Sequence, residues 1–176
     1  MKSRQIVLGI LMRSPQTGYD ITQMFQTSFA FFFDSSSGMV YPVLRKLEKE
    51  GKVTKEVVPQ DGKPDKNLYT ITQKGKEEFT EYLSSPVERQ IKKSDFLARL
   101  MFGDYMEPDQ LREIIEDYVR KEKEETELLS ERLEKYINKS SRKMTDTETL
   151  AYEYGVEANK FQVEFFEKWL ENHPKI

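Results

Sequence analysis

The first 83 residues change their hydrophobic periodicity from helical to strand-like and back, in an order that few folds accommodate. Apolar side chains first recur at the three- and four-residue spacing of α-helices. This pattern predicts three helices, over residues 3–13, 19–29 and 38–49. Two segments rich in β-branched residues then flank a polar loop, which is typical of a β-hairpin. The strands are predicted at 53–58 and 68–72, and a fourth helix at 74–83.

Three helices followed by a hairpin are typical of the winged helix-turn-helix, in which the second helix of the motif enters the DNA major groove. In this chain that helix is the segment 38–49. Its apolar residues share one face, whereas Tyr41, Arg45 and Lys49 follow one another four residues apart on a different face. The sequence therefore predicts a buried side and a DNA-reading side. The predicted DNA-binding residues are Tyr19, Ser35, Ser36, Ser37, Tyr41, Arg45, Lys49, Lys63 and Lys66.

Some aromatic residues in this half have a structural interpretation beside the functional one. Tyr41 is equally suited to pack against the preceding helix, and Tyr19 to join the core instead of contacting a phosphate. The phenylalanines between residues 29 and 33 are interpreted as core and interface packing, with a ligand pocket as the alternative.

Ser84, Ser85 and Pro86 mark a change in composition and a predicted domain boundary. Residues 1–83 contain 12 Lys and Arg against 10 Asp and Glu, whereas residues 84–176 contain 16 against 21. This modest difference in charge suggests a division of labour between the two halves. In the second, periodicity predicts helices over 94–102, 109–138 and 146–171.

The last predicted helix carries a stripe of large apolar residues, and a stripe of this kind favours packing against another helix. It predicts a homodimer interface formed by Leu150, Tyr154, Phe161, Phe165 and Trp169. Stacking of Trp169 on an effector is the alternative. The polar stretch from Lys121 to Glu127 is interpreted as a solvated face where the long helix leaves its partner. The predicted fold is mainly α with a small β-hairpin: an N-terminal winged helix-turn-helix and a C-terminal antiparallel helical dimerisation domain.

The residue inventory argues against catalysis. The chain has no cysteine, and His173 is its single histidine, so thiol nucleophiles, thiolate zinc sites and histidine-based catalysis are not expected. It also has no phosphate-binding or dinucleotide-binding glycine motif. We therefore expect no enzyme activity, no metal and no cofactor. No apolar run is long enough to span a membrane and no signal peptide is recognised, which predicts a cytoplasmic protein.

Three runs in the N-terminal half resemble the PadR family of bacterial transcription regulators. They are Gly18-Tyr19-Asp20, the run from Gly38 to Gly51 with its Tyr-Pro-x-Leu-x-x-Leu-Glu-x-x-Gly pattern, and Leu68 to Gly75 with its Tyr-x-Ile-Thr-x-x-Gly pattern. The resemblance implies a homodimer that usually represses transcription, with dimerisation through the C-terminal helices and release by small aromatic effectors. Two recognition helices would then bind a pseudo-palindromic operator in double-stranded DNA.

Two other hypotheses remain open at this point. The total charge of −3, with Asp61 and Asp65 near the hairpin tip, motivates a winged-helix scaffold that binds proteins and not DNA. The aromatic cluster around residues 29–33 motivates a small ligand-sequestering protein.

Overall fold

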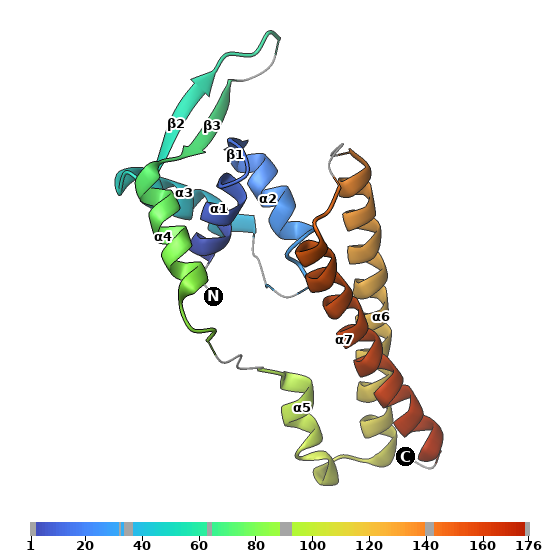
Figure 1. Cartoon of the computed structure of the whole chain (residues 1–176). Coiled ribbons are helices and arrows are strands. Elements are labelled where there is room, and N and C mark those ends of the chain that lie inside the picture. The colour runs from blue at the N-terminus through green and yellow to red at the C-terminus, as the bar shows by residue number, and fades with distance from the viewer. Residues whose placement is uncertain are drawn as a thin grey trace. The chain divides into compact units, whose positions relative to one another are not determined.

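The computed structural model of the chain describes residues 3–31, 33, 37–62, 65–88, 93–139 and 143–174. They belong to two compact units, Met1–Arg89 and Gln90–Ile176, and each unit is described by itself. The predicted fold class is confirmed: the first unit is a winged helix-turn-helix with a small antiparallel sheet, and the second contains two long helices packed together (Figure 1).

The first unit packs its helices around one apolar core, and two strands extend beyond the helices (Figure 1). Its helical elements are α1 (Ser3–Leu11), α2 (Gly18–Gln26), the short 3-10 helix η1 (Ser37–Met39), α3 (Val40–Lys49) and α4 (Gln73–Ser84). Its strands are β1 (Gln16–Thr17), β2 (Val53–Val58) and β3 (Lys66–Ile71). The buried core comprises Ile6, Val7, Leu8, Ile10, Leu11, Ile21, Phe25, Val40, Leu44, Leu47, Val53, Tyr69 and Ile71.

The predicted hairpin is confirmed, with β2 and β3 paired antiparallel from Val53 opposite Ile71 to Val58 opposite Lys66. We call this β2–β3 hairpin the wing. The sheet also has a third strand, β1, which lies between the first two predicted helices and was not predicted. Gln16 pairs with Tyr69 and Thr17 with Leu68, giving the order β1-β3-β2. A strand of two residues shows no alternation, so periodicity does not reveal it.

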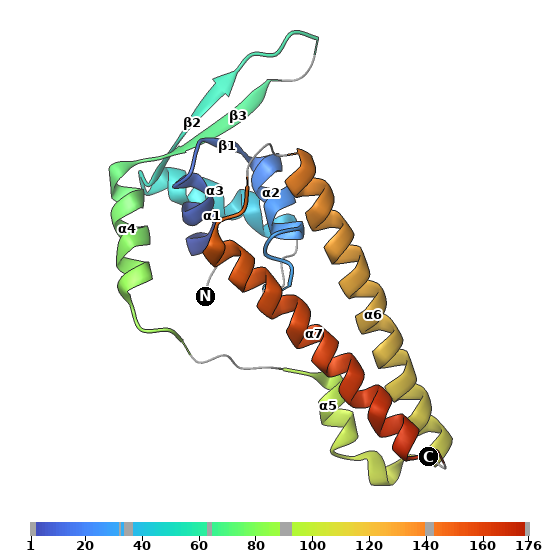
Figure 2. The ribbon, with the colours of Figure 1, turned by 45° about the vertical axis from the view of Figure 1, so that its right-hand side comes forward.

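The second unit is built on an antiparallel pair of long helices, α6 (Pro108–Lys139) and α7 (Asp146–Asn172) (Figure 2). A capping box is present at the start of α7, where Thr145 and Glu148 bind each other's backbone amides. The apolar side chains buried in this unit are Ile115, Val119, Leu129, Leu133, Val163 and Leu170.

The short helix α5 (Asp95–Leu100), followed by the 3-10 turn η2 (Gly103–Tyr105), is attached to the long helices by aromatic rings. Phe96 of α5 stacks on Tyr118 of α6 with ring centroids 3.8 Å apart. Both rings lie nearly perpendicular to the ring of Phe166 in α7, with centroids 5.0 and 5.6 Å away. Aromatic packing therefore joins all three helices of this unit.

A chain of hydrogen bonds crosses from α6 to α7 near the middle of the pair. Tyr118 donates to Gln162 (3.4 Å), Gln162 donates to Asn159 (3.3 Å), and Asn159 donates to Thr126 (3.0 Å). Thr126 in turn donates to the backbone carbonyl of Glu122 (2.7 Å). Most of the stretch from Lys121 to Glu127 is exposed, as predicted for a solvated face. The interpretation that α6 leaves its partner there is wrong, because Thr126 binds Asn159 and Lys123 pairs with Glu167 of α7.

Within the described ranges, no helix is long and apolar enough to cross a membrane. The same ranges contain no cluster of His, Cys, Asp or Glu side chains that could hold a metal ion.

Candidate nucleic-acid interface

The two faces of α3 are separated as a DNA-reading helix requires. Val40, Leu44 and Leu47 are at most 1% exposed and fix one side of the helix in the core. Tyr41, Arg45 and Lys49 are exposed on another side. The structure thus brings these three predicted residues together on one accessible face of the recognition helix, α3.

The cations on the exposed face of α3 are not paired with neighbouring carboxylates, so they are available to bind DNA phosphates or bases. Arg45, Lys46 and Lys49 make no hydrogen bond or ion pair with any residue in the described part of the chain. The neighbouring carboxylates are engaged elsewhere: Glu48 pairs with Lys55 of β2 at 3.7 Å, and Glu50 with Arg4 of α1 at 2.5 Å. The exposed face is therefore positively charged, although the chain as a whole is acidic.

Tyr41 both packs against α2 and remains half exposed. Its ring lies so close to Gly18 that a Cβ atom on that glycine would stand 2.6 Å from the ring. Because 48% of the side chain is still exposed, the packing interpretation and the DNA-contact prediction are compatible. Tyr19, in the first turn of α2, is 64% exposed, so its interpretation as a core residue is wrong.

The start of α2 is fixed by a capping box between Thr17 and Asp20. The Asp20 amide donates to the Thr17 hydroxyl at 3.1 Å, and that hydroxyl donates to the Asp20 carboxylate at 2.7 Å. This explains the Gly18-Tyr19-Asp20 run: glycine admits the Tyr41 ring, tyrosine is exposed, and aspartate completes the cap.

The remaining predicted DNA-binding residues are only partly covered by the structure. Lys66 is exposed at the start of β3, beside the exposed Asp65. Ser35, Ser36 and Lys63 lie outside the described residues. Ser37 begins η1, but its side chain is likewise outside the description. The sequence interpretation missed Lys55, which lies on the wing next to α3, because no local pattern distinguishes it from other strand lysines.

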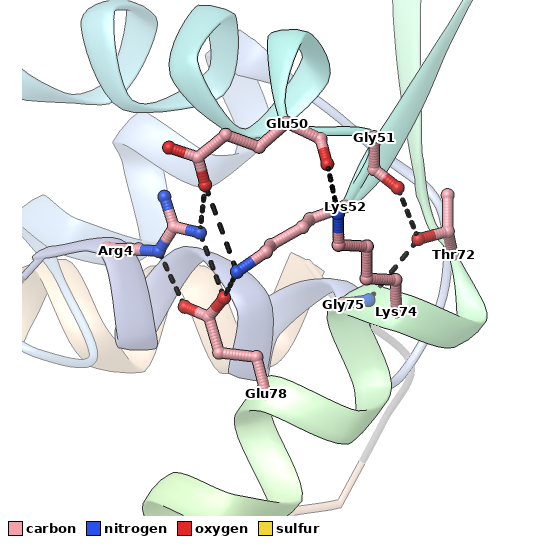
Figure 3. Close-up of polar contacts among 8 residues, drawn as sticks. All are labelled: Arg4, Glu50, Gly51, Lys52, Thr72, Lys74, Gly75 and Glu78. Carbon is pink, nitrogen blue, oxygen red and sulfur yellow. Dashed lines mark hydrogen bonds and ion pairs between the residues drawn. The ribbon is translucent and has the colours of Figure 1, made fainter.

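Four charged residues hold the end of α3 and the start of the wing in place (Figure 3). Arg4 of α1 contacts Glu78 of α4 at 2.5 Å and Glu50, just after α3, at 2.5 Å. Lys52, just before β2, also pairs with Glu78 and lies 3.8 Å from Glu50. We call this group the Arg4 cluster.

The Arg4 cluster is largely shielded from water, with side chains between 19% and 33% exposed. Hydrogen bonding to Arg4, reinforced by Lys52, lowers the pKa of Glu78 to about 2. The bond to Arg4 also lowers the pKa of Glu50. In return, bonding to Glu78 raises the pKa of Arg4. These shifts keep Arg4, Glu50 and Glu78 charged at neutral pH, and each carboxylate of the cluster faces a cation.

The Leu68–Gly75 run forms the junction between the wing and α4. The Thr72 hydroxyl caps α4 by accepting from the Gly75 amide (3.2 Å) and donates to the Gly51 carbonyl (2.8 Å; Figure 3). A Cβ atom on Gly75 would stand 2.3 Å from the Lys52 carbonyl oxygen. The threonine and glycine of this motif thus allow the start of α4 to lie against the base of the wing.

Most of the stripe predicted as a dimer interface is exposed within its own unit. The exposed fractions are 67% for Leu150, 68% for Tyr154, 67% for Phe161 and 54% for Phe165. Trp169 is instead partly buried, and its ring stacks on His173 at 4.3 Å. The first four residues therefore offer an apolar surface along α7, and Trp169 forms its more sheltered end.

Comparisons with known proteins agree with this geometry. Residues 7–81 match the transcriptional regulator PadR-like family, and residues 92–173 match the virulence activator alpha C-term family. The crystal structure of smu.1604c from Streptococcus mutans UA159 is 42% identical, with a TM-score of 0.83 over 97% of this chain and 99% of that chain. The PadR-like transcriptional regulator BC1756 from Bacillus cereus is 41% identical, with a TM-score of 0.85 over 98% and 95%.

A curated relative has an assigned function. The negative transcriptional regulator PadR of Bacillus subtilis is 29% identical over 117 residues, which cover 65% of this chain and 64% of that protein. The match thus spans less than two thirds of the relative's length. A structure of the same regulator with operator DNA is 26% identical and has a TM-score of 0.78 over 96% of both chains. With its recognition helix, wing and paired C-terminal helices, the chain belongs to the PadR-like family of DNA-binding transcription regulators, a family without enzymatic activity.

Proposed function

We propose that the protein is a homodimeric repressor that places α3 of each subunit in successive major grooves of a pseudo-palindromic operator. The observation that carries this proposal is the exposed face of α3, where Arg45, Lys46 and Lys49 make no hydrogen bond or ion pair with any described residue. The two half-sites would lie about 34 Å apart, one turn of DNA. The operator complex of the B. subtilis relative supports this use of the fold.

The proposed dimer forms through the apolar stripe of α7. Leu150, Tyr154, Phe161 and Phe165 leave large apolar side chains in water within their own unit, and Trp169 extends the stripe. Burying such a stripe against a second copy removes it from water, which favours association. Residues 1–83 would then bind DNA and residues 84–176 would dimerise, in a protein acting on the bacterial chromosome in the cytoplasm.

We propose repression, with release by a small aromatic compound, as the mode of regulation. The B. subtilis relative is a negative regulator, and a structure of it contains p-coumaric acid. In this chain a pocket of about 270 Å³ lies between α5 and α6. Its walls include the stacked rings of Phe96 and Tyr118, on which a planar ring can pack. This pocket is the first place to look for such a ligand.

The test combines sedimentation with retention of the DNA upstream of the protein's own coding region, over a range of salt concentrations. We expect a dimer that retains this DNA and not a shuffled sequence, with affinity that falls steeply as salt rises. Removal of Lys49 as Lys49→Ala should reduce the slope of log affinity against log salt by about 1 if it contacts a phosphate. A dimer that retains no DNA at low salt would contradict the proposal and favour the protein-binding scaffold.

A further inference from the structure

An ion pair connects the wing to the recognition helix. Lys55 Nζ of β2 lies 3.7 Å from Glu48 Oε1 of α3, and the two side chains are 37% and 35% exposed. Lys55 stands opposite Tyr69 in the β2–β3 ladder. Burial raises the pKa of the Tyr69 hydroxyl, Glu48 raises it further, and Arg45 opposes the shift. Glu48, Arg45 and Tyr69 therefore lie near one another at this junction.

Glu48 has a second cation within reach on its own helix. Arg45 precedes it by three residues, and oppositely charged side chains at this spacing on a helix attract each other. In the structure Glu48 contacts Lys55, while Arg45 forms no ion pair with any described residue. The Glu48 carboxylate is thus directed toward Lys55 on the wing and not toward Arg45 on its own helix.

A free arginine at this position can read a base. Arg45 lies in the second turn of α3, and residues toward the start of a recognition helix contact base edges in the major groove. The planar guanidinium donates two parallel hydrogen bonds to O6 and N7 of guanine. An arginine paired with Glu48 would have these donors occupied. The lysines at 46 and 49 carry compact charges without such a fork, which suits them to phosphates.

We infer that Arg45 reads a guanine in each operator half-site, and that Lys55 is a positioning residue that keeps Glu48 away from it. The inference rests on the proposed function, because it assigns roles within the same DNA interface. The wing then contributes to base recognition through a contact made inside the protein, in addition to any contact of its own with DNA.

The first experiment selects binding sites for the full-length protein from a randomised double-stranded DNA library and measures the preference for each base. In Arg45→Ala, we expect the preference for guanine at one position of each half-site to fall about 5- to 150-fold. Lys46→Ala is the control, because loss of a phosphate contact should weaken binding to all sequences alike. An unchanged guanine preference in Arg45→Ala would overturn the inference.

The second experiment tests Lys55 with Lys55→Met, Glu48→Gln and the double variant. A surface ion pair is weak, so we expect Lys55→Met to lower the guanine preference by about two- to fivefold. Adding Glu48→Gln should restore the guanine preference, because the double variant has no carboxylate at position 48 that could pair with Arg45. Lys76→Met removes an exposed positive charge from α4, which carries none of the predicted DNA-binding residues, and should leave base preference as in the wild type. A preference unaltered in Lys55→Met, or not restored in the double variant, would show that Lys55 does not position Arg45.

The outcomes separate this inference from the proposed function. A wild-type protein without any sequence preference would contradict both. A wild-type protein that prefers one sequence, with the same preference in Arg45→Ala, would contradict the inference alone. Arg45 is exposed and the Lys55–Glu48 pair lies at the surface, so the variants are expected to fold, and circular dichroism checks this.

Discussion

Most of the buried apolar side chains in the described residues belong to the winged unit, whereas most of the large exposed ones belong to the C-terminal unit. The winged unit packs helices and strands around a single core and adds the Arg4 cluster, which links α1 and α4 to the segment between α3 and β2. The C-terminal unit buries a narrow seam between α6 and α7 and leaves much of α7 uncovered. A unit with a closed core can be stable alone, while one with an uncovered stripe gains stability from a partner. Stability and association are thus expected to reside in different halves of the chain.

The largest expected effect comes from creating a cavity in the core of the winged unit by a substitution. Leu44 is fully buried, so Leu44→Ala should cost about 2–5 kcal/mol of unfolding free energy. Urea unfolding followed by circular dichroism measures the change, which should not depend on protein concentration. Leu83→Ala, at a side chain 65% exposed in α4, is the control and should have little effect. Equal effects from the two substitutions would contradict a closed core.

The corresponding change in the C-terminal unit is expected to act on association. Phe161→Ala removes a 67% exposed ring from the centre of the α7 stripe and should weaken the proposed dimer by about 2 kcal/mol or more. Sedimentation over a dilution series would show a shift toward monomer. Lys160→Ala, a neighbouring exposed residue paired with Glu157, is the control. A dimer that survives Phe161→Ala unchanged would remove this stripe from the interface, and the same test applies to Trp169→Ala.

The Arg4 cluster gives the winged unit a pH dependence. A carboxyl group whose pKa is lower in the folded chain stabilises the fold above its unfolded value, about 4.5 for Glu78, and this contribution is lost as the pH falls toward about 2. Glu78→Gln should therefore cost about 2 kcal/mol at pH 7 and much less near pH 2. Urea unfolding at several pH values measures the difference. Glu77→Gln, at the preceding and more exposed position, is the control. Its effect on the free energy of unfolding should change less with pH.

The smallest expected effect concerns the hydrogen bonds between α6 and α7. Asn159→Ala leaves the Thr126 hydroxyl without its α7 donor and should cost about 1 kcal/mol of unfolding free energy. Asn172→Ala, which removes a bond only to the carbonyl of Lys168 in its own helix, is the control. If the two variants are equally stable in thermal unfolding, the bonds between α6 and α7 contribute nothing to holding the pair together.

Features set by nearby residues were predictable from the sequence. The recognition helix follows from its apolar spacing, the wing from two β-branched segments, and the cap of α7 from Thr145 and Glu148. Each signal lies within a few residues, where local propensity and side-chain spacing determine the structure. The exposed cations of α3 were predictable for the same reason.

Features that depend on distant residues were not predictable. Arg4 and Glu78 are separated by 74 positions, and nothing in either neighbourhood indicates the partner. The Lys55–Glu48 pair depends on how β2 lies against α3, and the α6–α7 hydrogen bonds depend on the axial alignment of two long helices. Charged and polar residues in such places look like ordinary solvated residues until the fold brings them together.

The close approach of Tyr41 to Gly18 has a consequence for genetic screens. Gly18 is buried and faces no solvent, yet any side chain there would displace the Tyr41 ring from its place beside α2. A search for variants that lose operator binding should therefore recover position 18 together with the exposed residues of α3. Such a variant would resemble the loss of a DNA contact, although the altered residue touches no nucleotide.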